Sequence, residues 1–189
     1  IRALASRGCT AAVADILAYA RDRDDTVRRG SLEALGVLAA GSVAPTVIDL
    51  VVNPADPADR PAAETAAGSV LARIADPEER ARPVLAALRG ARGEGRSAVI
   101  RLLGKAGSPS ALVAVQAALD EPDQRDAAVR TLAGWPTTAP AETLLALASD
   151  ADSQIHKVLA IRGYVRMAAQ SDDPTAMYVR AMDRAERVE

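Results

Sequence analysis

The chain has 189 residues with 23 lysines and arginines against 25 aspartates and glutamates, so its net charge is only -2. This balance gives no overall attraction to nucleic acid or to an anionic membrane. The only cysteine, Cys9, excludes an internal disulfide framework and a zinc site built from several cysteines. No uncharged apolar run approaches the roughly 20 residues that a membrane helix needs, and we expect a cytoplasmic protein.

Prolines recur along the chain at nearly equal intervals of 32, 32, 31 and 34 residues. Several of them follow a small polar residue, which caps the free N–H groups of a helix start while proline fits the first helical position. A helix start with this period predicts a stack of similar units rather than one globular core. The five prolines are Pro45, Pro77, Pro109, Pro140 and Pro174.

Each unit is predicted to be a pair of helices joined by a short turn. We expect the first helices of the pairs, the A helices, at about 10–22, 44–53, 77–90, 109–120, 140–150 and 174–188. The second helices, the B helices, are expected at about 1–7, 25–40, 60–75, 95–107, 123–135 and 153–169. No segment alternates polar and apolar residues over a useful length, so no strand is expected.

The predicted fold is therefore all-α, an α-α superhelix in the form of a right-handed solenoid of about five to six helical hairpins. The whole chain, 1–189, is expected to form one array without a domain boundary. Its approximate units are 1–8 (partial), 9–41, 42–75, 76–107, 108–136, 137–170 and 171–189 (partial).

The B helices align on one column of mostly apolar residues. Positions four before and three after this column share its helical face, so together they should form the buried stripe. Trp135 falls three residues after the column and is expected in the core. The column consists of Leu4, Leu35, Leu71, Leu103, Leu132 and Val165.

Three segments carry a resemblance to a known family: Asp25-Thr26-Val27-Arg28 with Ala34-Leu35-Gly36, Arg96 with Leu102-Leu103-Gly104, and Asp123-Gln124-Arg125 with Thr131-Leu132-Ala133. In these segments the chain resembles HEAT-type α-helical repeat proteins, the ARM/HEAT-like α-solenoids, and its alanine and arginine content resembles bacterial members. The resemblance implies a polar ladder between adjacent units, with an acid at the turn and an arginine early in the B helix. The implied ladder residues are Asp25, Arg28, Glu94, Arg96, Asp123 and Arg125. Glu64 and Val158 occupy the arginine column in two units, where we expect the ladder to break.

No residue pattern in the sequence predicts catalysis, a cofactor or a metal site. The HEAT-type enzyme deoxyhypusine hydroxylase needs repeated His-Glu pairs, and none occurs here; His156, the only histidine, is expected to be solvated. Cys9 has no identifiable catalytic partner and is expected to pack at a helix start. The glycine-rich stretch 90–97 lacks the strand and the Gly-Lys-Ser/Thr ending of a phosphate loop, so we expect an inter-helix turn.

Basic residues dominate the B helices of the later units. In HEAT-like solenoids these helices line the concave surface, so the resemblance implies a basic groove despite the near-neutral total charge. Arg101 and Arg130 lie in one column, two residues before the apolar column, which predicts a row across neighbouring units. The candidate concave binding surface is Arg101, Lys105, Arg130, Arg162, Tyr164 and Arg166.

The sequence thus favours a non-catalytic scaffold that binds a protein or peptide partner along a curved surface. One alternative is a nucleic-acid-binding solenoid similar to the HEAT-like alkylpurine DNA glycosylases, although few aromatic residues are available to stack on bases. Another is an accessory repeat region of a larger bacterial enzyme, because the chain opens at Ile1 and not at a methionine. We expect a monomer or weak end-to-end self-association through the terminal helices.

Overall fold

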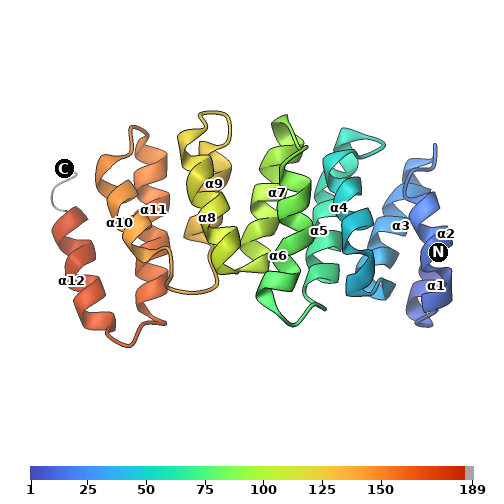
Figure 1. Ribbon diagram of the computed structural model, residues 1–189, viewed down its shortest axis with the longest axis horizontal. Coiled ribbons are helices and arrows are strands. Elements are labelled where there is room, and N and C mark those ends of the chain that lie inside the picture. Colours follow the sequence, from blue (N-terminus) through green and yellow to red (C-terminus); the bar gives the residue numbers. More distant parts are fainter. Residues whose placement is uncertain (186–189) are drawn as a thin grey trace.

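The computed structural model is a row of helices that follow one another in chain order, with α1 and α2 at one end and α12 at the other (Figure 1). The structure describes residues 1–185. Every regular element in this part of the chain is a helix, which confirms the predicted all-α fold. No helix within residues 1–185 combines the length and the apolar character needed to cross a membrane.

Two series of helices alternate along the chain, as predicted. The A helices are η1 (Thr10–Ala12) with α2 (Val13–Tyr19), α4 (Ala44–Val52), α6 (Pro77–Leu88), α8 (Pro109–Ala117) with η4 (Ala118–Asp120), α10 (Ala141–Asp150) and α12 (Pro174–Ala185). The B helices are α1 (Arg2–Ser6), α3 (Asp25–Leu38), α5 (Arg60–Leu71), α7 (Gly93–Ala106), α9 (Arg125–Ala133) and α11 (Gln154–Ala168). Short 3-10 turns, η2 (Gly41–Val43) and η3 (Pro57–Asp59), precede α4 and α5. The part of the last predicted helix beyond residue 185 lies outside the described residues.

Polar side chains cap the helix starts at Pro77, Pro109 and Pro174, whereas no side chain caps α4 at Pro45 or α10 after Pro140. The Asp76 carboxylate accepts a hydrogen bond from the Glu79 N–H at 2.8 Å. The Ser108 hydroxyl accepts one from the Ala111 N–H at 3.1 Å. Such caps satisfy N–H groups that the first helical turn leaves free, so the proline period reports real helix starts.

Extensive contacts join only helices that are near neighbours in chain order. Each B helix from α3 onward packs on the A helix before it and on the B helix of the preceding unit. The B helices α1, α3, α5, α7, α9 and α11 therefore form one uninterrupted row. The core lies between this row and the A helices, and both series contribute buried apolar side chains to it.

The apolar column is confirmed in four B helices, where Leu35, Leu71, Leu103 and Leu132 are all 0% exposed. It is wrong at the two ends. Leu4 is 38% exposed because α1 has α3 alone as an extensive neighbour, and Val165 is 40% exposed. In α11 the buried residue is Tyr164, one position earlier, and Ala160 and Met167 are buried with it. With Tyr164 in the column, the stripe of α11 matches those of the other B helices.

Apolar side chains are also exposed on the terminal helices. Tyr19 on α2 is 48% exposed, while Val179 and Met182 on α12 are 52% and 63% exposed. These helices have neighbours on one side of the row only. End-to-end self-association stays a prediction.

Small residues let neighbouring B helices approach closely. A Cβ added at Gly163 would lie 2.6 Å from the Cα of Ala133, across the contact between α11 and α9. A Cβ at Gly104 would lie 2.7 Å from Cγ2 of Thr131, across the contact between α7 and α9. Larger side chains at these positions would push the helices apart.

We expect Gly163→Ala to lower the free energy of unfolding by about 1–3 kcal/mol, because its methyl group would meet the backbone of α9 and overpack the contact. Gly68→Ala is the matched control, since Gly68 lies inside α5 with open space around it. The control should raise stability by about 0.5–1 kcal/mol through helix propensity alone. Denaturant unfolding measures both, and equal effects would contradict the close approach of α9 and α11.

Candidate functional site

The ladder arginines reach acids of the following unit. Arg28 Nε donates to Asp59 Oδ2, and these two residues are only 7% and 3% exposed. Arg96 donates through Nε and Nη2 to both carboxylate oxygens of Glu121, at 2.9 and 2.6 Å. Each pair joins one helical hairpin to the next, as the ladder prediction requires.

The prediction of which acids pair with the ladder arginines is wrong. Asp25 lies 3.5 Å from Arg29 within its own helix, and Glu94 and Asp123 form no ion pair within residues 1–185. Asp25 and Glu94 sit in the first turn of a B helix, where an acid favours the positive end of the helix dipole. The acids that pair with the arginines come instead from the turn of the next unit.

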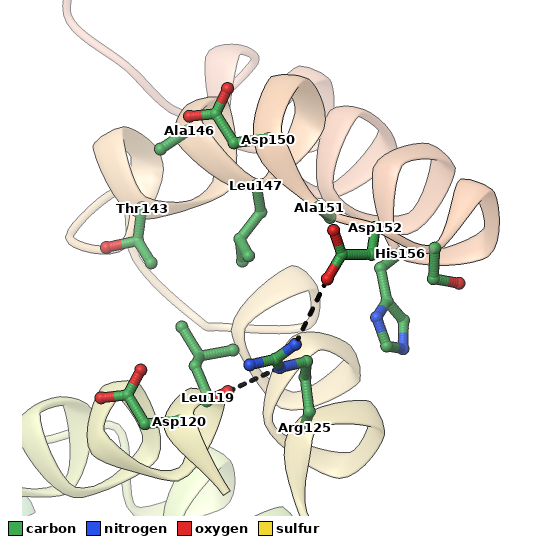
Figure 2. A pocket seen from close by; sticks show the side chains of 11 residues that line it. Leu119, Asp120, Arg125, Thr143, Ala146, Leu147, Asp150, Ala151, Asp152 and His156 are labelled. Carbon is green, nitrogen blue, oxygen red and sulfur yellow. Dashed lines mark hydrogen bonds and ion pairs between the residues drawn. The ribbon is translucent and has the colours of Figure 1, made fainter. Parts of the chain in front are cut away.

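Arginines at the starts of α5, α7 and α9 tie these B helices to the A helix before them. Arg96 Nη1 donates to the Leu88 carbonyl at the end of α6, at 2.8 Å. Arg125 Nε donates to the Leu119 carbonyl at 2.7 Å, and its Nη1 lies 3.9 Å from Asp152 in the next unit (Figure 2). In the unit of α5, Arg60 makes the contact with the preceding A helix: its Nε donates to the Val51 carbonyl in the last turn of α4, at 3.1 Å.

Shallow grooves run between neighbouring B helices on their exposed side. One of about 700 Å³ lies between α5 and α7 and is lined by Arg101 and Lys105 among others. A second of about 200 Å³ lies between α7 and α9 and is lined by Arg101, Lys105 and Arg130. The structure therefore brings together three of the predicted surface residues.

Two arginines of this surface are held by acids on the B helices. Arg101 donates through Nε and Nη2 to both oxygens of Glu64, at 2.9 and 2.6 Å. The hydrogen bond to Glu64 raises the pKa of Arg101 above its ordinary value. Arg130 Nε donates to Asp126 at 2.8 Å, one turn earlier on α9. Glu64, expected to break the ladder, therefore anchors the B-helix surface instead.

Lys105 and Arg162 have neither an acidic partner nor a side-chain hydrogen bond among the described residues, whereas Arg166 has no acidic partner but donates to backbone carbonyls. Lys105 follows Arg101 by one turn on α7, and Arg162 lies on the exposed side of α11. With Tyr164 in the apolar column, Arg162 joins Arg101 and Arg130 two residues before that column. We call Arg101, Lys105, Arg130 and Arg162 the basic row.

Two other predicted surface residues have structural roles. Tyr164 is fully buried, so its expected place on the surface is wrong; it fills the apolar column of α11, and burial raises the pKa of its hydroxyl. Arg166 donates to the carbonyls of Ala133 and Trp135 at 2.9 and 2.7 Å, which caps the end of α9. Trp135 is 1% exposed, which confirms its predicted place in the core.

A further hollow, of about 510 Å³, lies where η4 and the start of α9 meet α10 and the start of α11 (Figure 2). Leu119 and Leu147 face each other across it, and Arg125 and Asp152 lie at its edge. His156 lines it with a side chain only 15% exposed, so the expected solvated position is wrong. Its Nε2 lies 3.3 Å from Asp126 on α9.

The remaining candidate residues occupy structural positions. The stretch 90–97 forms the turn between α6 and α7 and the first residues of α7, so helices flank it on both sides, as predicted. Cys9 is partly buried and directly precedes η1. Within residues 1–185, no three histidine, cysteine, aspartate or glutamate side chains form a cluster that could hold a metal ion.

No known protein-family model matches the chain, and no curated protein matches it. The basic row offers exposed N–H donors and positive charge along three adjacent B helices, an arrangement suited to holding an anionic partner.

We expect Asp59→Ala to lower the midpoint of thermal unfolding by roughly 6–15 °C, because it leaves the nearly buried Arg28 guanidinium without its carboxylate. Asp123→Ala removes an expected ladder acid that is exposed and forms no ion pair with a described residue. This control should change the midpoint by less than about 2 °C. Similar midpoints for the two variants would rule out Asp59 as the ladder partner.

The ladder also predicts a dependence of stability on pH. The hydrogen bonds from Arg96 hold the pKa of Glu121 below its ordinary value. The Glu121 carboxylate therefore stabilises the fold above its unfolded-state pKa of about 4.3, and this contribution is lost as the pH falls through the lowered folded-state pKa. Glu121→Gln should be less stable than the wild type by about 1–3 °C at neutral pH and should approach it under acid conditions. Thermal unfolding across a pH series measures the difference, and a constant gap would contradict the prediction.

Proposed function

We propose that this chain is a non-catalytic binding scaffold whose B-helix side receives a segment of another protein. In this proposal the described helices form a right-handed HEAT-like solenoid, and the B helices line its concave side. The solenoid is supported by the finding that extensive packing joins only helices close in chain order. In a solenoid, each repeat unit contacts only the units beside it.

The observation that carries the proposal is the uncompensated charge of the basic row. Lys105 and Arg162 have no acidic partner among the described residues, while most arginines at the unit junctions donate to carboxylates or to helix-end carbonyls. Exposed cations beside the inter-helix grooves can hold carboxylates of a partner at modest energy per contact. Contacts from successive units then add up along the row.

A nucleic-acid-binding solenoid is less well supported. Single-stranded nucleic acid is held by aromatic side chains on which bases stack; Trp135 and Tyr164 are buried, and the exposed Tyr19 and Tyr178 lie on A helices at the ends of the row. Glu64 and Asp126 pair with two cations of the basic row, so its positive charge is not continuous, as closely spaced phosphates would require.

Selection from a library of random displayed peptides tests the proposal. We expect enriched peptides to be acidic and to bind the double variant Lys105→Glu/Arg162→Glu at least about tenfold more weakly, since two exposed charge contacts are reversed. Arg23→Glu/Arg89→Glu is the control of equal charge change, because both residues are exposed and neither forms an ion pair with a described residue. Its affinity should fall far less. Failure to enrich any peptide, or equal losses in the two double variants, would overturn the proposal.

A further inference from the structure

We infer that the segment received by the basic row is an extended acidic peptide in the polyproline II conformation, with a carboxylate at every third residue. This inference rests on the proposed function and specifies its partner. It follows from the spacing of the helices that carry the cations and from the donors that remain free on these cations.

The first step is the spacing of the row. Its cations come from α7, α9 and α11, which pack against one another in succession. Helices in contact have axes about 8–10 Å apart, and small residues such as Gly104 and Gly163 keep these contacts close. A ligand that crosses the row therefore meets a new helix roughly every 9 Å.

The second step is the match between this spacing and a peptide backbone. A polyproline II helix has three residues per turn and rises about 3.1 Å per residue, so every third side chain returns to the same side after about 9 Å. A β-strand returns a side chain to the same side every second residue, after only about 6.6 Å. An α-helix returns a side chain to nearly the same side after one turn of about 5.4 Å, which also falls short of the spacing of about 9 Å.

The third step concerns donors that are free for a ligand. Arg130 gives only Nε to Asp126, which leaves both of its Nη groups for a second carboxylate. Arg101 gives Nε and Nη2 to Glu64, which leaves Nη1. Glu64 and Asp126 thus hold the guanidinium groups in place, while Lys105 and Arg162 supply charge that no described acid neutralises.

The charge pattern favours a peptide over DNA. Duplex DNA carries one charge per about 1.7 Å of its axis and binds bands of closely spaced cations. The basic row offers four cations over three helices, and acids pair with two of them. Widely spaced carboxylates fit this pattern better than continuous phosphates do.

The test compares two fluorescent peptides of identical composition by anisotropy at low ionic strength. One repeats Glu-Pro-Pro, which fixes the polyproline II conformation and places a glutamate at every third residue. The other contains the same residues with the glutamates in adjacent pairs. We expect the repeating peptide to bind about tenfold more tightly, through two or three additional charge contacts.

Variants of the basic row show whether the advantage of the repeating peptide depends on the spacing of the cations or only on the net charge of the protein. Arg130→Gln removes the middle cation, so the repeating peptide should lose most of its advantage over the paired peptide. Arg89→Gln, a change of equal charge at the end of α6, should leave the advantage intact. Equal affinities of both peptides for the wild type, or an advantage that survives Arg130→Gln, would overturn the inferred spacing.

The outcomes also distinguish the inference from the proposed function. If both peptides bind equally and both lose affinity in Lys105→Glu/Arg162→Glu, the scaffold stands and only the spacing is wrong. If neither peptide binds but a short DNA duplex does, the protein-binding function is wrong as well. If neither peptide nor DNA binds, both proposals fail.

Discussion

The close approach of successive B helices is the constraint on which the rest of the structure depends. Gly104 and Gly163 lie where the neighbouring helix leaves no room for a side chain. Because α7, α9 and α11 are thereby held at a short and regular separation, residues at equivalent positions of each helix become neighbours in space. A row of surface cations exists only because this separation repeats from one unit to the next.

Arginines at the starts of the B helices keep the hairpins in this arrangement. Arg96 illustrates the arrangement, since it binds a carbonyl of the preceding A helix and both oxygens of Glu121 in the following unit. The planar guanidinium with its five N–H donors can make both connections at once, which a lysine ammonium does less well. Arg125 makes the same two kinds of contact, with the Leu119 carbonyl and with Asp152, whereas Lys105 and Arg162 of the basic row make no such contact with a described residue.

Local signals predicted the fold well. Caps such as Asp76 and Ser108, each followed by proline, act within one helical turn, so sequence alone placed the helix starts. The position of Tyr164 was missed because tyrosine has both an apolar ring and a polar hydroxyl, and the adjacent Val165 matches an aliphatic column equally well. The ladder acids were missed because the nearest acid in sequence looked suitable, whereas Arg28 binds Asp59 in the next unit.

The candidate site could be predicted only in part from the sequence, because it also depends on contacts between units. Arg101 and Arg130 were placed in one row by periodicity, but their pairing depends on contacts that periodicity does not encode. Glu64 lies 37 residues before the arginine it holds, and the two meet only because α5 packs on α7. Arg162 belongs to the row because the buried column residue of α11 is Tyr164 and not Val165.

The central claim is that the B-helix side is the binding surface. Backbone amide NMR during titration with the Glu-Pro-Pro peptide tests it most directly, because it maps contacts residue by residue. The account predicts chemical-shift changes concentrated around Arg101, Lys105, Arg130 and Arg162 on α7, α9 and α11. Changes concentrated on the A helices, or around the hollow lined by Leu119 and Leu147, would contradict it.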